Sequence, residues 1–166
     1  MLSVQWPLAG DDTRDHLTAR HQRCLDVVPF EAWHVDHMQL RPEQESIAVD
    51  LTPEYAKALE RSGAAFTAWA GSTVVACAGY IHFWPGRAQV WAMMSHGIRQ
   101  YGPSIHRHVA RYIAAHPVTR LECIIDPKFE VSVRWARRLG FAYESTMQRY
   151  GLHGQDMDMY VFEGSH

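Results

Sequence analysis

The sequence predicts an α+β fold built around one mixed β-sheet. Three consecutive apolar runs are separated only by short turn signals, which is the pattern of an antiparallel meander. A strand pattern between two helical patterns follows, and a strand–helix–strand unit requires a parallel crossover within the sheet. Two further strand patterns close the chain. The predicted order is strand, two helices, three-stranded meander, helix, strand, helix and two strands.

The first part of the chain is expected to stand apart from this fold. Residues 1–30 are predicted to be an N-terminal helical extension, and residues 31–166 a single domain. Residues 11–13 (Asp-Asp-Thr) offer N-cap chemistry for a polar helix that runs to about Val27. Pro29 would end that helix. Because the helix has few apolar side chains to bury, we expect it to be peripheral.

The single domain is expected to begin with one strand and two helices. The first strand is predicted at residues 34–40, where HVDHMQL alternates between apolar and polar side chains. Pro42 suits the first turn of a short helix over residues 43–50. A second helix is predicted to start at residues 52–54 (Thr-Pro-Glu) and to end before Gly63.

The remaining elements follow from apolar runs and their spacing. The meander strands are expected at residues 64–70, 73–84 and 87–95, with reversals at residues 71–72 and 85–86. Ile105, Val109 and Ile113 keep a helical spacing before the strand RLECII at residues 120–125. A second helical stripe ends at Gly140. The last two strands are expected at residues 142–150 and 156–162, joined by a turn near residues 153–154.

The composition fits one soluble globular domain and argues against several classes of protein. A chain of 166 residues is long enough for one sizeable core. No run of about 18 apolar residues predicts a membrane span. A net charge of −2 gives no general attraction to nucleic acid. Cys24, Cys77 and Cys123 are odd in number and far apart, which argues against a disulfide framework, and no secretory signal is evident, so we expect a cytoplasmic protein.

Near its C-terminus the chain reads RWARRLGFAYESTMQRY, in which a helical stripe ends in Leu-Gly-Phe and a strand leads to Arg149 and Tyr150. Together with the predicted order of elements, this segment resembles the GNAT superfamily of N-acetyltransferases over residues 33–162. The resemblance implies a GNAT-like fold, acetyl-CoA as co-substrate, and acetyl transfer to a primary amine on a small molecule or a protein. VWAMMS, RLECII and RWARRLGF further resemble the phage-encoded subset of that superfamily.

In that family a loop of the form R/Q-x-x-G-x-G/A binds the pyrophosphate of acetyl-CoA, and the matching stretch here is RQYGPS. The resemblance assigns cofactor binding to Arg99, Gln100, Tyr101, Gly102 and Ser104. Glycine permits close approach of a ligand, and backbone N–H groups at a helix N-terminus attract anions. Ser104 stands where Gly or Ala is usual, and Pro103 lacks a donor. The alternative interpretation is an ordinary helix start with basic neighbours.

The family's fourth and fifth strands part, and unpaired backbone groups there contact the pantetheine and the thioester. The resemblance therefore adds Met93, Met94 and Ser95 as backbone ligands of the cofactor. The family's usual proton donor is a Tyr four residues before the Gly of Gly-Phe, and that position is Ala136 here. Phe129 occupies the position of a usual Asn. Either another residue protonates the leaving thiolate, or the chain does not transfer acetyl groups.

Direct acetyl transfer needs a base for the amine and an acid for the thiolate. Glu122, in an otherwise apolar strand, is the first candidate base, with a raised pKa beside the parting strands. Its alternative is a carboxylate paired with an arginine. His82 is a second candidate base, because histidine exchanges protons near neutral pH, and Tyr150 is the candidate acid. For both, the alternative is a purely structural side chain.

No metal site is predicted. His34, Asp36 and His37 are ligand types, but residues three apart on the predicted strand face opposite sides.

Two functions remain open at this stage. The first is an acetyl-CoA-dependent N-acetyltransferase. The second is a catalytically silent GNAT-like protein that serves in binding or assembly, for example in a phage particle, with residues 1–30 docking a protein partner.

Overall fold

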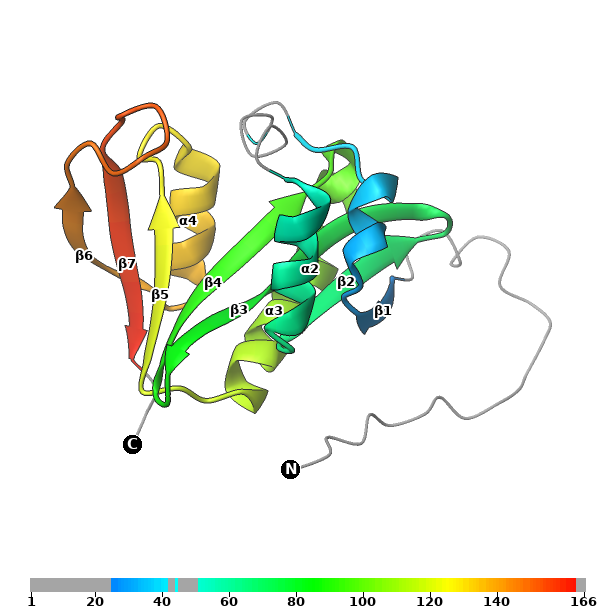
Figure 1. The fold of residues 1–166 in the computed structure, drawn as a ribbon, viewed down its shortest axis with the longest axis horizontal. Helices are drawn as coiled ribbons and strands as arrows, with labels where there is room; N and C mark the ends of the chain where they lie inside the picture. Colours follow the sequence, from blue (N-terminus) through cyan, green and yellow to red (C-terminus); the bar gives the residue numbers. More distant parts are fainter. Residues whose placement is uncertain (1–24, 42–43, 45–50, 164–166) are drawn as a thin grey trace.

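The computed structural model describes residues 25–41, 44 and 51–163, which form a seven-stranded mixed sheet with helices on both faces (Figure 1). The strands lie in the order β1-β2-β3-β4-β5-β7-β6. The predicted α+β class is confirmed.

The three apolar runs form the antiparallel meander that the sequence predicts. They are β2 (Ala65–Ala70), β3 (Thr73–Trp84) and β4 (Arg87–Met94). Glycines at positive φ lie in the two predicted reversals, at Gly71 and Gly86. β3 is the longest strand; its first half pairs with β2 and most of its length pairs with β4, so it forms the centre of the meander.

The sheet is interrupted between β4 and its parallel neighbour β5 (Arg120–Ile125). Pairing runs only from Arg87 opposite Arg120 to Gln89 opposite Glu122. Beyond this point the two strands diverge toward their C-terminal ends (Figure 1). The crossover that joins them consists of η4 (His96–Tyr101) and α3 (Gly102–Ala115), as predicted.

The C-terminal elements continue the sheet beyond β5. Helix α4 (Glu130–Arg138) is followed by the edge strand β6 (Ala142–Met147) and by β7 (Met157–Glu163), which lies antiparallel between β5 and β6. Gly140 adopts a φ of 97°, a conformation that L side chains rarely adopt, and so allows the chain to leave α4 and enter β6.

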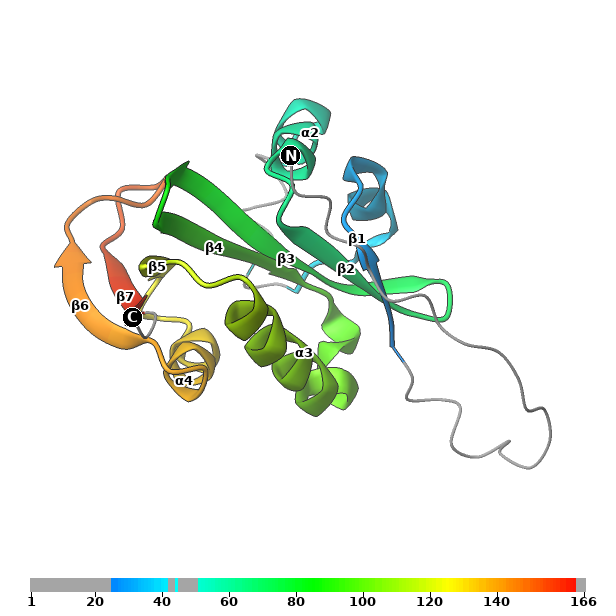
Figure 2. The same cartoon turned by 90° about the horizontal axis from the view of Figure 1, so that it is seen from below.

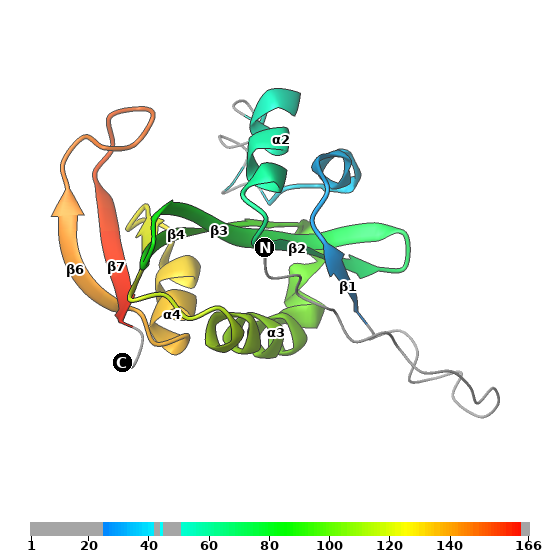
Figure 3. The same cartoon turned by 60° about the horizontal axis from the view of Figure 1, so that its bottom comes forward.

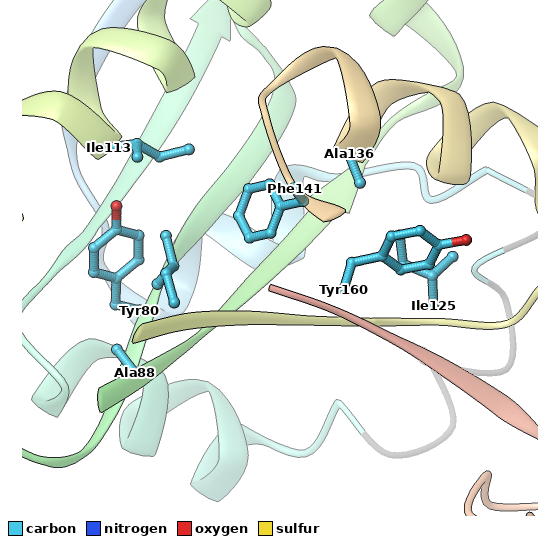
Figure 4. Close-up of a cluster of buried hydrophobic side chains, with 8 residues drawn as sticks. Tyr80, Ala88, Ile113, Ile125, Ala136, Phe141 and Tyr160 are labelled. Carbon is cyan, nitrogen blue, oxygen red and sulfur yellow. The ribbon is translucent and has the colours of Figure 1, made fainter. Parts of the chain in front are cut away.

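The helices form two layers around the sheet. α3 and α4 cover one face, whereas α2 (Pro53–Arg61) and the 3-10 helix η2 (Ala32–His37) lie on the other (Figures 2 and 3). α2 begins as predicted, since the Thr52 hydroxyl accepts a hydrogen bond from the Tyr55 N–H at 3.2 Å. The largest buried cluster lies under α3 and α4 and includes Tyr80, Leu121 and Phe141 (Figure 4).

Two predictions near the N-terminus are wrong. Residues 34–40 do not form the first strand, because residues 32–37 are the 3-10 helix η2. This helix is fixed by a reciprocal cap between Glu31 and His34, and the Glu31 N–H donates to His34 Nδ1 at 3.1 Å. Val35, Met38 and Leu40 pack against the sheet, and after η2 Met38 and Leu40 make single β-bridges to Val74 and Ser95.

The predicted helix also does not extend to Val27. The first strand is β1 (Asp26–Pro29), which pairs antiparallel with β2. As an edge strand it tolerates the proline that the sequence analysis placed at a helix end. The rest of that predicted helix, and the predicted helix at residues 43–50 apart from Gln44, lie outside the described residues.

Candidate functional site

The site begins where β4 and β5 part, because backbone groups there lose their ladder partners. The Ser95 N–H donates to the Val75 carbonyl on β3 at 3.0 Å. Consecutive residues of a strand direct their backbone groups to opposite edges of the strand. Ala92 and Met94 therefore direct their N–H and C=O groups to the edge that β5 has left.

A cavity of about 490 Å³ fills this opening. On the face covered by α3 and α4 it is lined by side chains that include Val109, Tyr112, Cys123, Ser132, Trp135 and Ala136. On the face covered by α2 the lining includes Tyr55, Leu59 and Trp91. The turn after β5 adds Asp126, and the β6–β7 loop adds Leu152 and Gln155. The cavity thus has walls on both faces of the sheet, and its volume lies in the range of small-molecule sites.

The charges at this cavity are few. Among the described residues that line it, Asp126 is the only carboxylate and Arg41 the only cation. One carboxylate oxygen of Asp126 accepts a hydrogen bond from the Lys128 N–H at 2.9 Å. The indole Nε1 of Trp91 and the hydroxyl of Tyr80 are buried and have no hydrogen-bond partner among the described residues. A mostly apolar cavity with a few unsatisfied polar groups is typical of a ligand site.

The predicted phosphate loop lies directly after β4. Arg99 and Gln100 are exposed in η4, and Gly102 is the first residue of α3, with Ser104 in its first turn. Backbone N–H groups in the first turn of a helix have no partner inside the helix. The position and direction of α3 therefore suit an anion at this end of β4. Binding of the cofactor by this loop stays a prediction.

Gly102 is not required by the fold. Its φ is −47°, and a Cβ added there would meet no atom within 4 Å. A larger side chain could therefore be accommodated by the protein itself, and only a ligand placed against the loop would demand glycine.

The predicted backbone ligands Met93, Met94 and Ser95 are at the end of β4, but they are not equivalent. Met93 and Ser95 direct their backbone groups to β3, as the bond from Ser95 to Val75 shows. Only Met94 faces the opening, and its N–H is not unpaired, because it donates to Gln44 Oε1 at 2.8 Å. The expectation of unpaired N–H groups on all three residues is wrong for this reason.

Glu122 is a paired carboxylate. It is 1% exposed and accepts hydrogen bonds from Arg87 at 2.7 and 2.9 Å and from Arg120 at 2.6 Å. The hydrogen bonds from Arg87, and then those from Arg120, outweigh burial and hold the pKa of this carboxyl below its ordinary value. The expected raised pKa is therefore wrong, and Glu122 is poorly suited to accept a proton near neutral pH.

The ion pairs of Glu122 with Arg87 and Arg120 link neighbouring strands of the sheet. Glu122 is the last residue of β5 that pairs with β4, and Arg120 also binds Glu144 on β6. The network therefore joins β4, β5 and β6 at the closed end of the opening. It holds together the strands that diverge a few residues later.

The other two predicted catalytic residues lie outside the cavity lining. His82 is exposed and pairs with Ala88 near the β3–β4 turn, at the closed end of the opening. Tyr150 is 59% exposed in the loop between β6 and β7, and its neighbours Gly151 and Leu152 line the cavity. Tyr150 is thus adjacent to the site, whereas His82 is not brought to it.

Ala136, at which the resemblance places the family's proton donor, lies on α4 and lines the cavity. Ser132, one helical turn earlier on the same face, and Cys123 on β5 also line the cavity. Burial raises the pKa of the Cys123 thiol to about 12, so this thiol is inert as a nucleophile at neutral pH.

Sequence reasoning missed Gln44, Asp126 and the orphan indole of Trp91. A single Gln after a proline, or an Asp after an apolar strand, carries no signal of its own. Their roles depend on the opening between β4 and β5, which no local pattern specifies.

The described part of the chain shows no group of three or more His, Cys, Asp or Glu side chains placed to hold a metal ion. His34 is buried, with Thr67 Oγ1 2.8 Å from its Nδ1. In the same part of the chain no helix is long and apolar enough to cross a membrane.

The fold of this chain is similar to those of solved acetyltransferase structures. The chain superimposes on Ard1 from Thermoplasma volcanium with a TM-score of 0.72 and 11% identity, covering 86% of this chain and 99% of Ard1. A GNAT-family acetyltransferase from Bacillus anthracis gives a TM-score of 0.62 at 11% identity, covering 84% of this chain and 94% of that one.

The fold is that of the GNAT acetyltransferases. RimL, a ribosomal L7/L12 alpha-N-protein acetyltransferase solved in complex with coenzyme A, gives a TM-score of 0.61 at 14% identity, covering 84% of this chain and 93% of RimL. No protein-family model matches the sequence, and no curated protein matches it. The GNAT likeness is therefore one of structure.

Proposed function

We propose that this chain is an N-acyltransferase that transfers an acetyl group from acetyl-CoA to a primary amine. The observation that carries the proposal is the opening between β4 and β5, where one cavity has walls on both faces of the sheet within a GNAT fold. A thioester that enters along α3 and an amine that enters from the α2 face would meet in this cavity.

The residues present fit acetyl-CoA at this place. The pyrophosphate would lie against the N-terminus of α3 at Gly102 and Ser104, with Arg99 nearby. The pantetheine amides and the thioester oxygen would pair with backbone groups of Ala92 and Met94 on this edge of β4, in place of the contacts that Gln44 makes there. When bound, acetyl-CoA supplies the activated acyl group.

The acceptor amine is proposed to enter from the α2 face. Asp126 is the only carboxylate among the described residues that line the cavity, so it would hold an incoming ammonium group and take up its proton. Tyr150 remains the proposed proton donor to the thiolate, since its neighbours in the β6–β7 loop line the cavity. Glu122 and His82 are not retained as bases, because one is paired with two arginines and the other lies away from the cavity.

The first test is titration calorimetry of the purified protein with acetyl-CoA and with CoA. Binding in the micromolar range, followed by release of free CoA in the presence of an amine panel, is the expected result. Absence of binding at millimolar ligand would contradict the proposal.

A catalytically silent GNAT-like protein is the second candidate, and Ala136 favours it, because alanine cannot protonate a thiolate. In that case the fold would serve binding or assembly, as in a phage particle, with residues 1–30 contacting a protein partner. CoA binding without any thiol release across the amine panel would support this candidate.

A further inference from the structure

The open edge of β4 is occupied by the protein's own chain. The Gln44 side-chain amide donates to the Ala92 carbonyl at 2.9 Å, and its oxygen accepts from the Met94 N–H at 2.8 Å. The backbone N–H of Arg41 donates to the Met94 carbonyl at 3.1 Å. The Ala92 carbonyl and both the N–H and the carbonyl of Met94, which face away from β3, therefore have hydrogen-bond partners within the protein.

The arrangement has the geometry of strand pairing. One amide bridges the carbonyl of one residue and the N–H of the residue two positions further on, as a neighbouring strand would do. Gln44 makes this contact with a side chain, so its amide takes the place of a backbone or ligand amide. Gln44 and Arg41 also line the cavity, which places the contact inside the candidate site.

A pantetheine arm carries two secondary amides and needs the same kind of pairing to lie along β4. The Met94 N–H has one hydrogen to donate, and the Gln44 oxygen accepts it. Gln44 and a pantetheine carbonyl therefore cannot both accept a hydrogen bond from this donor at the same time. A ligand that pairs with Met94 must first displace Gln44.

Resting on the proposed function, we propose that Gln44 is an internal competitor of the acyl-CoA pantetheine arm for the edge of β4. The protein binds its co-substrate by exchanging the Gln44 amide for a pantetheine amide at Ala92 and Met94. The apparent affinity for CoA is reduced by the fraction of molecules in which Gln44 occupies the edge.

The experiment measures the dissociation constant of CoA by calorimetry for the full-length protein and for three variants. Gln44→Ala removes the competing amide, and Gln44→Met keeps the length of the side chain without its polar group. Gln39→Ala is the matched control, since Gln39 lies in the same segment with an exposed side chain. Because CoA would no longer have to break the two hydrogen bonds of Gln44, we expect both Gln44 variants to bind CoA on the order of tenfold more tightly. The affinity of Gln39→Ala for CoA should be unchanged.

A second readout does not depend on the ligand. In the ligand-free protein, hydrogen exchange at the Met94 amide should be faster in both Gln44 variants than in Gln39→Ala or the unaltered chain. Faster exchange together with tighter CoA binding supports the inference, as does binding that appears only in the Gln44 variants.

The two possible failures are distinguishable. If all proteins bind CoA and the Gln44 variants bind equally or more weakly, the competition is overturned while the proposed function stands. If none of the four proteins binds CoA or acetyl-CoA, the proposed function fails and the competition fails with it, whatever the exchange rate at Met94.

Discussion

Replacing Glu122 by glutamine tests the ion-pair network that closes the opening between β4 and β5. The carboxylate is 1% exposed, whereas the side chains of Arg87 and Arg120 are 31% and 33% exposed. Breaking a buried pair costs about 3–5 kcal/mol, because charge is left without its partner. Since both arginines keep contact with water, we expect a loss of about 3 kcal/mol, at the lower end of that range. Urea unfolding at neutral pH measures it.

Glu144→Gln is the matched control, because Glu144 binds the same Arg120 but its side chain is 42% exposed. An exposed pair of this kind is screened by water and contributes far less to stability than a buried one. If Glu122→Gln cost no more than Glu144→Gln, the reasoning that the buried network holds β4 to β5 would be refuted.

The stability difference between the unaltered chain and Glu122→Gln should depend on pH in a defined direction. The pKa of Glu122 is depressed in the folded protein, first by its hydrogen bonds to Arg87. Its stabilising contribution is therefore complete above the unfolded pKa of about 4.3 and is lost as the pH falls through the folded pKa. The stability gap between the unaltered chain and Glu122→Gln should be constant from pH 5 to pH 7 and should narrow in more acidic solution. A gap that widens on acidification would contradict the assignment.

Three further outcomes are expected at the cavity. Gly102→Val should leave the melting temperature unchanged, since a Cβ there meets nothing within 4 Å, and should weaken CoA binding about tenfold or more, because charge-assisted hydrogen bonds are lost; calorimetry at equal affinity would refute the phosphate loop. Ala136→Tyr should raise acetyl turnover by about 100-fold through a restored acid, whereas Ala136→Phe should not; equal rates in the two variants would show that the hydroxyl has no role. Asp126→Asn should raise KM for the amine, lower kcat and leave CoA affinity unaltered. Weaker CoA binding with unchanged amine kinetics would contradict the proposed role of Asp126.

The elements with strong local signals were predictable from the sequence. The meander follows from alternating apolar runs bounded by Gly71 and Gly86, and the end of α4 from Gly140, because these features act within a few residues. The start of α3, which follows β4 and the 3-10 helix η4 and has Gly102 in its first turn, was predictable for the same reason.

Other features were decided by the tertiary structure. HVDHMQL alternates like a strand, but the cap between Glu31 and His34 and packing on the sheet make its first residues a 3-10 helix. Glu122 could be a base or a paired carboxylate on sequence alone. Arg87 decides between them, and it lies 35 residues away on a neighbouring strand.

The sequence by itself determined the order of the elements from α2 onward and the place of the candidate loop, because turn chemistry and apolar spacing are local properties. Only the tertiary structure decided where the sheet opens, which carboxylate lines the cavity there, and that Gln44 reaches the edge of β4. Those facts depend on contacts between residues far apart in the chain. Such contacts arise only when the strands are assembled into one sheet.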